Sequence, residues 1–498
     1  MTSRLDECQL EILPRSRTAE AGTEWALARG EGGLQLVAVV PPGRQSLLED
    51  LEGRTEGDSA GTLLVGPTSS RNAAGLRRHL DWLRPRPLGT ATSAGLGDRL
   101  GLATPGHVRA VRTAGGGLRP IFAQQSIREM SRTGRTPVEV MDDATWGTLA
   151  EGWRGGVGAD ADHLKTPDDV DACLAAGFSF FTVDPGDHVD STADGAGPEE
   201  LRSAVAALPW TELEDTEADL RVRYLGRTVV VEDHTFELDE ATVLRAAAKY
   251  GRAVAHVVRM ERHLRTAAAG SREVELEVSV DETETPTTPA EHYWVASELR
   301  RLEVEWVSLA PRFVGRFEKG VDYIGDLDAL EADLAAHAAI ARQLGPYKLS
   351  LHSGSDKFSV YPIAARQTRG LVHLKTAGTS YLEALRTVAG LDAGLFREIY
   401  VFARERYETD RASYHVSARL DRAPEPDQVP ESGLASLLEH FDAREILHVT
   451  FGSVLTEPTA GGGFRFRHRL LGLLGAHPEA YAQNLETHFV RHLRPLAR

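Results

Sequence analysis

Short apolar runs in this sequence repeatedly end in residues that can bind metals or transfer protons. In "YKLSLHSGSDK", Leu349 and Leu351 alternate with smaller or polar residues before His352 and Lys357. "LVHLKTAGTS" repeats the pattern, with His373 inside the run. Eight such runs occur, and the polar residues at or near their ends are Asp98, Arg99, Gln124, Gln125, Asp160, Asp162, His163, Asp184, Asp187, His188, Asp281, Glu282, Glu284, Arg312, His352, Ser353, Asp356, Lys357, His373 and Lys375.

Histidines end or nearly end several of these runs, and carboxylates end others or the same ones. His163, His352 and His373 therefore predict a divalent metal site, with Asp160 or Asp162 as a further candidate ligand. Imidazole and carboxylate ligands without a thiolate suit Zn²⁺, Mn²⁺, Ni²⁺ or Co²⁺. A single histidine is more often a hydrogen-bonded structural residue or a substrate donor, but the set favours a metal.

The stretch "SVDETETPT" brings Asp281, Glu282 and Glu284 together after an alternating apolar strand. Glu282 and Glu284 share one face of an extended chain, and Asp281 points to the other face. A carboxylate that is partly buried among like charges has a raised pKa and suits proton transfer. We therefore predict a catalytic role for Glu282; the alternative is a solvated acidic loop.

Arginine and lysine side chains at the ends of the same runs suggest contacts with an anionic substrate. Arginine holds a carboxylate or phosphate through two hydrogen bonds, and lysine could also form a Schiff base. The alternative is ion pairing with the neighbouring aspartates. The sequence contains neither GxxxxGK[ST] nor GxGxxG, so a nucleotide is not indicated. The predicted substrate-binding residues are Arg99, Gln125, Arg312, Ser353, Asp356 and Lys357.

Helical patterns separate most of the eight apolar runs, and this alternation predicts a (β/α)8 barrel of the TIM type. The rival is a doubly wound open sheet, which has no reason to stop at eight strands. In such a barrel the carboxyl ends of the strands meet at one face, so the polar residues would converge on one basin. Asp98 and Glu282, on the first and fifth strands, would face each other there, and we predict both as acid/base residues.

The rest of the chain divides around this barrel. Short apolar runs such as "LQLVAVV" and "GTLLVG" indicate that residues 1–85 form a small β-containing region, which also includes a helix. The barrel is expected over residues 86–390, with a charged helical insertion after the fourth strand at residues 190–272. Residues 391–498 predict a helical C-terminal extension.

Charge, cysteine usage and the lack of targeting signals together predict a cytoplasmic protein. There are 56 Lys and Arg residues against 73 Asp and Glu residues, a net charge of −17, which argues against nucleic acid or an anionic membrane as partner. Cys8 and Cys173 form no CxxC or zinc-type spacing. The first residues show no apolar signal-peptide core, and no stretch approaches the length of a membrane span.

Longer strings of the chain, in a fixed order from about residue 90 to 455, carry a family resemblance. They are "LGDRLG", "TPGHVRA", "PIFAQQSIREMSRTGRT", "DDATWG", "GADADHLK", "FTVDPGDHV", "EVSVDETETPT", "EKGVDYIGD", "LSLHSGSDKFSVYP", "HLKTAGTSYLEALR" and "HVTFGSVL". Together they resemble the tagaturonate epimerase family. This resemblance implies a metal-dependent enzyme that interconverts D-tagaturonate and D-fructuronate, and some similar proteins also act on tagatose and fructose.

The resemblance implies inversion at C4 of a 2-keto sugar acid. C4 is β to the ketone, so the carbonyl does not acidify its C–H bond. We favour retro-aldol cleavage of C3–C4 followed by re-addition over deprotonation at C4. Transient oxidation would need a nicotinamide site that the sequence does not show. The alternative functions are an aldolase that releases both fragments, an aldose–ketose isomerase and a non-catalytic sugar-binding protein.

Overall fold

The computed structural model describes residues 5, 9–30, 33–59, 61–270 and 273–497. Cys8 lies outside these residues, so the prediction for this cysteine is not addressed. Cys173 is buried and unbridged, and burial raises the pKa of its thiol to about 12. Among the described helices, none combines the length and the apolar character that a membrane span requires.

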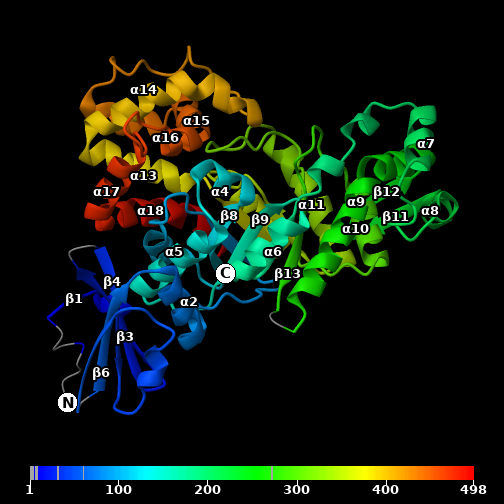
Figure 1. The fold of residues 1–498 in the computed structure, drawn as a ribbon. Helices are drawn as coiled ribbons and strands as arrows, with labels where there is room; N and C mark the ends of the chain where they lie inside the picture. The colour runs from blue at the N-terminus through cyan, green and yellow to red at the C-terminus, as the bar shows by residue number, and fades with distance from the viewer. Residues whose placement is uncertain (1–4, 6–8, 31–32, 60, 271–272, 498) are drawn as a thin grey trace.

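The N-terminal region is an antiparallel sheet covered by one helix, α2 (Ser70–His79) (Figure 1). Trp25, Leu27 and Leu36 alternate inward along two central strands and pack against Leu76 of the helix. The predicted β-containing region is therefore confirmed. Its strands are β1 (Glu11–Ile12), β2 (Thr18–Glu20), β3 (Thr23–Gly30), β4 (Gly33–Val40), β5 (Arg54–Asp58) and β6 (Gly61–Pro67).

Eight parallel strands close into a barrel, and they are the eight runs expected from the sequence. Neighbouring strands pair in parallel around the whole ring, so the open-sheet alternative is excluded. The strands are β7 (Ser93–Leu96), β8 (Arg119–Ser126), β9 (Gly158–Leu164), β10 (Phe180–Val183), β13 (Glu275–Val280), β14 (Ser308–Pro311), β15 (Lys348–Leu351) and β16 (Val372–Thr376).

Helices surround the barrel, and several begin at a cap that the sequence encodes. Thr136, Thr166 and Thr288 each accept a hydrogen bond from the third helical residue, and a proline follows each of them. Such starts fix where each strand-to-helix loop ends. The helices are α3 (Thr104–Ala114), α4 (Ile127–Thr133), α5 (Pro137–Ala150), α6 (Pro167–Ala176), α9 (Glu240–Ala268), α10 (Pro289–Arg301), α11 (Leu327–Leu344), α12 (Tyr361–Thr368) and α13 (Thr379–Leu391).

The insertion after the fourth barrel strand is shorter and less helical than predicted. It contains α7 (Pro198–Ala206), α8 (Glu217–Tyr224) and a hairpin of β11 (Arg227–Val231) with β12 (His234–Leu238), at the right of Figure 1. Helix α9 packs between α6 and α10, so it is a helix of the barrel itself. The insertion therefore ends near residue 239, because α9 buries one face against the barrel.

Helices also dominate the C-terminal extension, as predicted. Helix α18 packs against α3 and α13 and so ties the chain end to the barrel. Between α14 and α15 an irregular segment brings residues 414–417 to the cavity at the barrel mouth. The helices are α14 (Ala393–Asp410), α15 (Phe441–Val449), α16 (Phe451–Thr456), α17 (Arg467–Ala476) and α18 (Pro478–Leu493).

The barrel interior is unusually polar. Such interiors are normally filled by branched apolar side chains, but here Asp160, Glu277, Lys348 and His373 are all buried within it. Lys348 Nζ, on β15, donates to Ser93 Oγ, on β7, at 3.1 Å. The charged groups of the interior thus neutralise one another below the mouth.

Candidate active site

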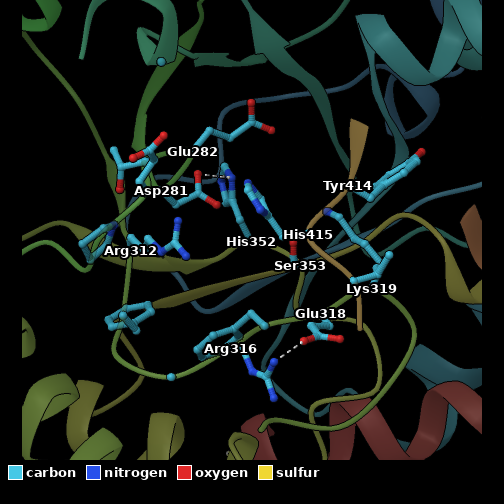
Figure 2. Close-up of a pocket in the computed structure, with 18 of the residues that line it drawn as sticks. Asp281, Glu282, Arg312, Arg316, Glu318, Lys319, His352, Ser353, Tyr414 and His415 are labelled. Atoms are coloured by element: carbon cyan, nitrogen blue, oxygen red, sulfur yellow. Dashed lines mark ion pairs between the residues drawn. The ribbon is translucent and has the colours of Figure 1, made fainter. Parts of the chain in front are cut away.

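Two adjoining cavities lie at the carboxyl ends of the barrel strands. The outer cavity has a volume of about 630 Å³ and is drawn in Figure 2, and the inner one has about 50 Å³. Strand ends, the loop before α11 and the C-terminal extension all contribute to their walls. The residues that line both cavities are Arg128, His163, Lys319, His352, Ser353 and Tyr414.

Two histidines lie together at this mouth, in a dense group of carboxylates. The rings of His163 and His352 are 5.1 Å apart and nearly perpendicular. His352 Nε2 lies 2.7 Å from Glu277 Oε1, and its Nδ1 lies 3.2 Å from Asp281 Oδ1. Burial lowers the pKa of His352, but the neighbouring carboxylates outweigh burial and raise it to about 10. Burial also lowers the pKa of His163, but Asp162 and the other carboxylates outweigh it and raise the pKa to about 9.

This group has the donors of a metal site. Ligand atoms of Asp162, His163 and His352 all lie within 4.8 Å of one another, and a second set joins His163 to Asp184 and Glu282. The buried His352 Nδ1 faces the Asp281 carboxylate at 3.2 Å, so an imidazole nitrogen and a further carboxylate lie side by side here. Imidazoles and carboxylates at this spacing fit a borderline divalent cation.

His373 lies in the barrel below this group, so its predicted place beside the other two histidines is wrong. Its Nδ1 is 2.9 Å from Ser93 Oγ, and its ring packs against Phe180 at 5.2 Å. Its Nε2 faces Asp160 at 3.8 Å. His373 sits inside its strand, whereas His352 follows one, and this offset along the barrel axis separates them.

Lys375 forms the floor between the two layers. Its Nζ lies 2.6 Å from Asp162 Oδ1, 3.0 Å from Asp160 Oδ2 and 2.8 Å from Glu277 Oε1. Burial lowers the pKa of this ammonium, but the three carboxylates outweigh burial and raise it above the ordinary value. Lys375 is therefore a fixed counter-ion of the carboxylates.

Of the two predicted acid/base residues, the structure places only Glu282 in the cavity. Glu282 lines the outer cavity, where Arg128 Nη2 lies 2.5 Å from its Oε1. Asp98 lines neither cavity, as far as the described residues define them. The Asp98 carboxylate instead accepts backbone N–H groups from the next turn, at 2.6–2.9 Å, and so fixes the loop after β7.

Three predicted substrate contacts do line the cavities. Arg312 and Ser353 face the outer cavity, and Arg99 faces the inner one. Arg99 is also paired with Glu129, with Nη2 2.5 Å from Oε1. The Arg312 guanidinium has no hydrogen-bond partner in the described structure, and burial lowers its pKa.

Gln125, Asp356 and Lys357 are predicted contacts that point elsewhere. Gln125 Oε1 accepts from Arg135 Nη1 at 3.0 Å; Gln124, one position earlier on the strand, faces the inner cavity instead. The two glutamines point to opposite faces because side chains alternate along a strand.

Asp356 and Lys357 belong to the support behind the cavity wall. The Asp356 carboxylate is buried and pairs with two residues, with Oδ1 2.7 Å from His488 Nε2 and Oδ2 3.0 Å from Arg444 Nη2. Lys357 Nζ donates to the carbonyl oxygens of Glu318 and Ser355, at 2.7 and 3.0 Å. Neither side chain lines the cavities that the described residues define.

Several cavity residues were missed because they do not follow barrel strands directly. Lys319 lies on the loop before α11, and Tyr414 and His415 come from the C-terminal extension (Figure 2). Arg132 packs on the Tyr414 ring and bonds its hydroxyl. The sequence signal for Lys319 is its position inside the string "EKGVDYIGD".

Comparison with known proteins agrees with this architecture over the full chain. The family described as tagaturonate epimerase matches residues 20–496. A tagaturonate/fructuronate epimerase of Thermotoga maritima is 41% identical over 483 residues, 97% of this chain and 96% of that protein. Native and glycerol-bound crystal structures of a fructuronate-tagaturonate epimerase from Cohnella laeviribosi are 39% identical, each covering 99% of this chain and 98% of its own, with a TM-score of 0.91. The chain belongs to the tagaturonate epimerase family and is an isomerase-type enzyme.

Proposed function

We propose that this enzyme interconverts D-tagaturonate and D-fructuronate by inverting C4. The observation that carries the proposal is a sugar-sized cavity in which the His163–His352 cluster and unpaired cations face one another, in a chain that the family matches almost from end to end. Activity on neutral ketoses, a cytoplasmic location and the lack of nucleic-acid or membrane partners stay predictions from the sequence.

We further propose a divalent cation held by His163 and His352, with Asp162 as the nearest carboxylate. The buried His352 ring, which has a carboxylate beside each nitrogen, and the surplus of carboxylates around it support this assignment. A cation there would stabilise negative charge that develops on the substrate. Zn²⁺, Mn²⁺, Ni²⁺ and Co²⁺ all suit the donors.

The proposed reaction breaks and re-forms the C3–C4 bond. Loss of the O4 proton turns the C4 alcohol into an aldehyde, and the C3–C4 electron pair moves into the enediolate of the three-carbon ketone fragment. Rotation about C4–C5 presents the other face of the aldehyde. Re-addition then forms the C3–C4 bond again with C4 in the inverted configuration, and O4 regains a proton.

Two groups on different walls are needed to move the O4 proton. Glu282 is our candidate on one wall, since Arg128 holds its carboxylate at the cavity surface. His415 lines the same cavity from the C-terminal extension and replaces Asp98 as the second candidate. An imidazole can both give and take a proton near neutral pH.

The test is incubation of metal-loaded and chelator-treated protein with tagaturonate, fructuronate, tagatose and fructose, with products separated by chromatography. We expect interconversion of the two uronates only in the metal-loaded sample. Release of three-carbon fragments without epimer would indicate an aldolase, and an aldose product would indicate an aldose–ketose isomerase. Full turnover by protein shown to be metal-free would refute the proposed cation.

A further inference from the structure

Lys319 is the unusual cation of this site. It lines both cavities, and in the described part of the chain its ammonium has no hydrogen-bond or ion-pair partner. Burial lowers its pKa. An enclosed ammonium without a partner is unfavourable unless a ligand supplies the missing contacts.

Two buried cations fix the backbone that carries Lys319. Lys357 Nζ donates to the carbonyl oxygens of Glu318 and Val321, at 2.7 and 2.5 Å. Arg444 Nε donates to the carbonyl oxygen of Gly320 at 2.5 Å. The backbone carbonyl groups of the residues before and after Lys319 are thereby held, so Lys357 and Arg444 are positioning residues for its side chain.

The inner cavity beside Lys319 offers further unmatched polar atoms. Arg99 Nη1, Gln124 Oε1 and both ring nitrogens of His448 are buried without hydrogen-bond partners in the described structure. Arg99 is 4% exposed and His448 is 1% exposed. These atoms surround a space of about 50 Å³, which suits a small polar group.

The electrostatics of the two ends of the site differ. The acids that act on Lys319 are Glu129, Glu282 and Asp281, and each is already paired, with Arg99, Arg128 and His352 in turn. The inner end is therefore electropositive.

At the other end, Arg312 lies beside Asp281, which pairs with His352, and beside Glu284, whose carboxylate has no partner in the described structure. Asp281 and Glu284 both act on its guanidinium. Arg312 and Lys319 lie on opposite sides of His352 in Figure 2. The acids beside Arg312 would repel an anionic group that approached it.

We propose that the inner cavity binds the C6 carboxylate of the keto-uronate through Lys319, which makes Lys319 the residue that selects uronates over neutral ketoses. This inference rests on the proposed function and adds the orientation of the substrate. The carboxylate end lies inward and the ketone end lies toward the outer cavity. An anchored C6 also lets C4 turn about C4–C5 while the aldehyde fragment stays bound.

The test compares Lys319→Gln with Arg312→Gln, which removes the rival cation. For both variants and the wild type, kcat/KM is measured with fructuronate and with fructose. Inhibition by glycerate and by glycerol is measured in parallel, since glycerate carries a hydroxy-carboxylate end and glycerol is its uncharged counterpart. Lys319→Arg, which keeps the charge, and thermal melting of each variant control for misfolding.

We expect Lys319→Gln to lower kcat/KM for fructuronate roughly 10- to 100-fold, the range for losing a hydrogen bond to a charged group, and to weaken glycerate inhibition by a similar factor. The kcat/KM for fructose and the inhibition by glycerol should stay nearly unchanged. Lys319→Arg should lose less of the activity on fructuronate than Lys319→Gln.

Three results would overturn the inference: equal losses on charged and uncharged compounds, a larger uronate-selective loss in Arg312→Gln, or no preference of the wild type for glycerate over glycerol. A wild type that leaves both uronates unchanged would instead refute the proposed function.

Discussion

Replacing His352 with glutamine tests the assignment of the metal site, and His373→Gln is its matched control. Both residues are buried histidines of the same barrel and were predicted together as ligands. His352 lies within 4.8 Å, atom to atom, of the candidate ligands His163 and Asp162, whereas His373 lies in the layer below. Ser359→Ala, beyond the polar run, provides a baseline.

The expected losses follow from the contacts of each ring. Loss of a supporting contact around a metal costs about 10–100-fold in affinity, so loss of a ligand at His352 should cost at least that. His373→Gln should keep its metal, because its ring contacts Ser93 and Phe180.

In metal-free protein His352 should also matter for stability. The rise of its pKa from 6.5 to about 10 corresponds to about 5 kcal/mol, and breaking a buried ion pair costs about 3–5 kcal/mol. Because the folded-state pKa is raised, this stabilisation is complete below pH 6.5, almost complete at pH 7, and lost as the pH rises through about 10.

Two measurements separate these effects. Elemental analysis after dialysis against limiting Mn²⁺ or Zn²⁺ gives the metal content, and urea unfolding of the chelator-treated proteins at pH 7 and pH 10 gives the stability. Equal metal content in His352→Gln and His373→Gln would refute the assignment of the ligands. The difference in unfolding free energy between the wild type and His352→Gln should shrink from pH 7 to pH 10. A difference that grows over this range would refute the argument that the protonated His352 ring stabilises the metal-free protein.

Three further outcomes can be measured. Binding of Mn²⁺ at pH 7 should release about two protons, because the pKa values of His163 and His352, about 9 and about 10, leave both rings protonated without metal; a calorimetric count near zero, corrected for buffer ionisation, would refute the binding of Mn²⁺ by two initially protonated rings. Substrate deuterated at C4 should keep its deuterium through turnover, whereas solvent deuterium at C4 would show direct deprotonation. Gly378→Ala should destabilise the protein by about 1–3 kcal/mol, since the new Cβ would lie 2.0 Å from His448 Cε1, and an unchanged melting temperature would contradict this packing argument.

The barrel could be predicted because each strand is a short apolar run that ends in polar residues, and because eight such units complete a ring. The hairpin of β11 and β12 was missed although Val229 and Val231 alternate with other residues, as strands do. Its flanks are charged helical segments, and a two-stranded hairpin is only marginally stable alone. It forms here because it packs on α10 and α11.

The sequence predicted where the site lies, at the carboxyl ends of the barrel strands, but only some of the residues that line it. Residues after a strand end reach the basin only if the loop turns them inward, and that depends on backbone hydrogen bonds that no pattern records. The Asp98 carboxylate accepts hydrogen bonds from backbone N–H groups of its own loop and so does not reach the cavity. Lys357 Nζ donates to three carbonyl oxygens and does not reach it either. Lys319 could not be selected by the strand-end rule, since it lies well inside the long loop that connects β14 to α11 and not at the end of the strand itself.

The charges at the mouth explain why the fold can tolerate this cluster with or without a cation. Around His163 and His352 the ion-pair contacts include five carboxylates, of Asp162, Asp184, Glu277, Asp281 and Glu282. Lysine and arginine partners within 3 Å reach three of them, through Lys375 and Arg128. The carboxylates of this group raise the pKa of both imidazoles, with Asp162 contributing most at His163 and Asp281 at His352.

A divalent cation bound by two neutral imidazoles carries the same total charge as two imidazolium rings. Binding would therefore exchange two protons for one cation without changing the net charge of the cluster, and the carboxylates would be balanced in both states. Chelator-treated protein should accordingly stay folded at neutral pH, held by the protonated rings. Above about pH 10 the rings lose their protons, and the five carboxylates then repel one another unless the cation is present.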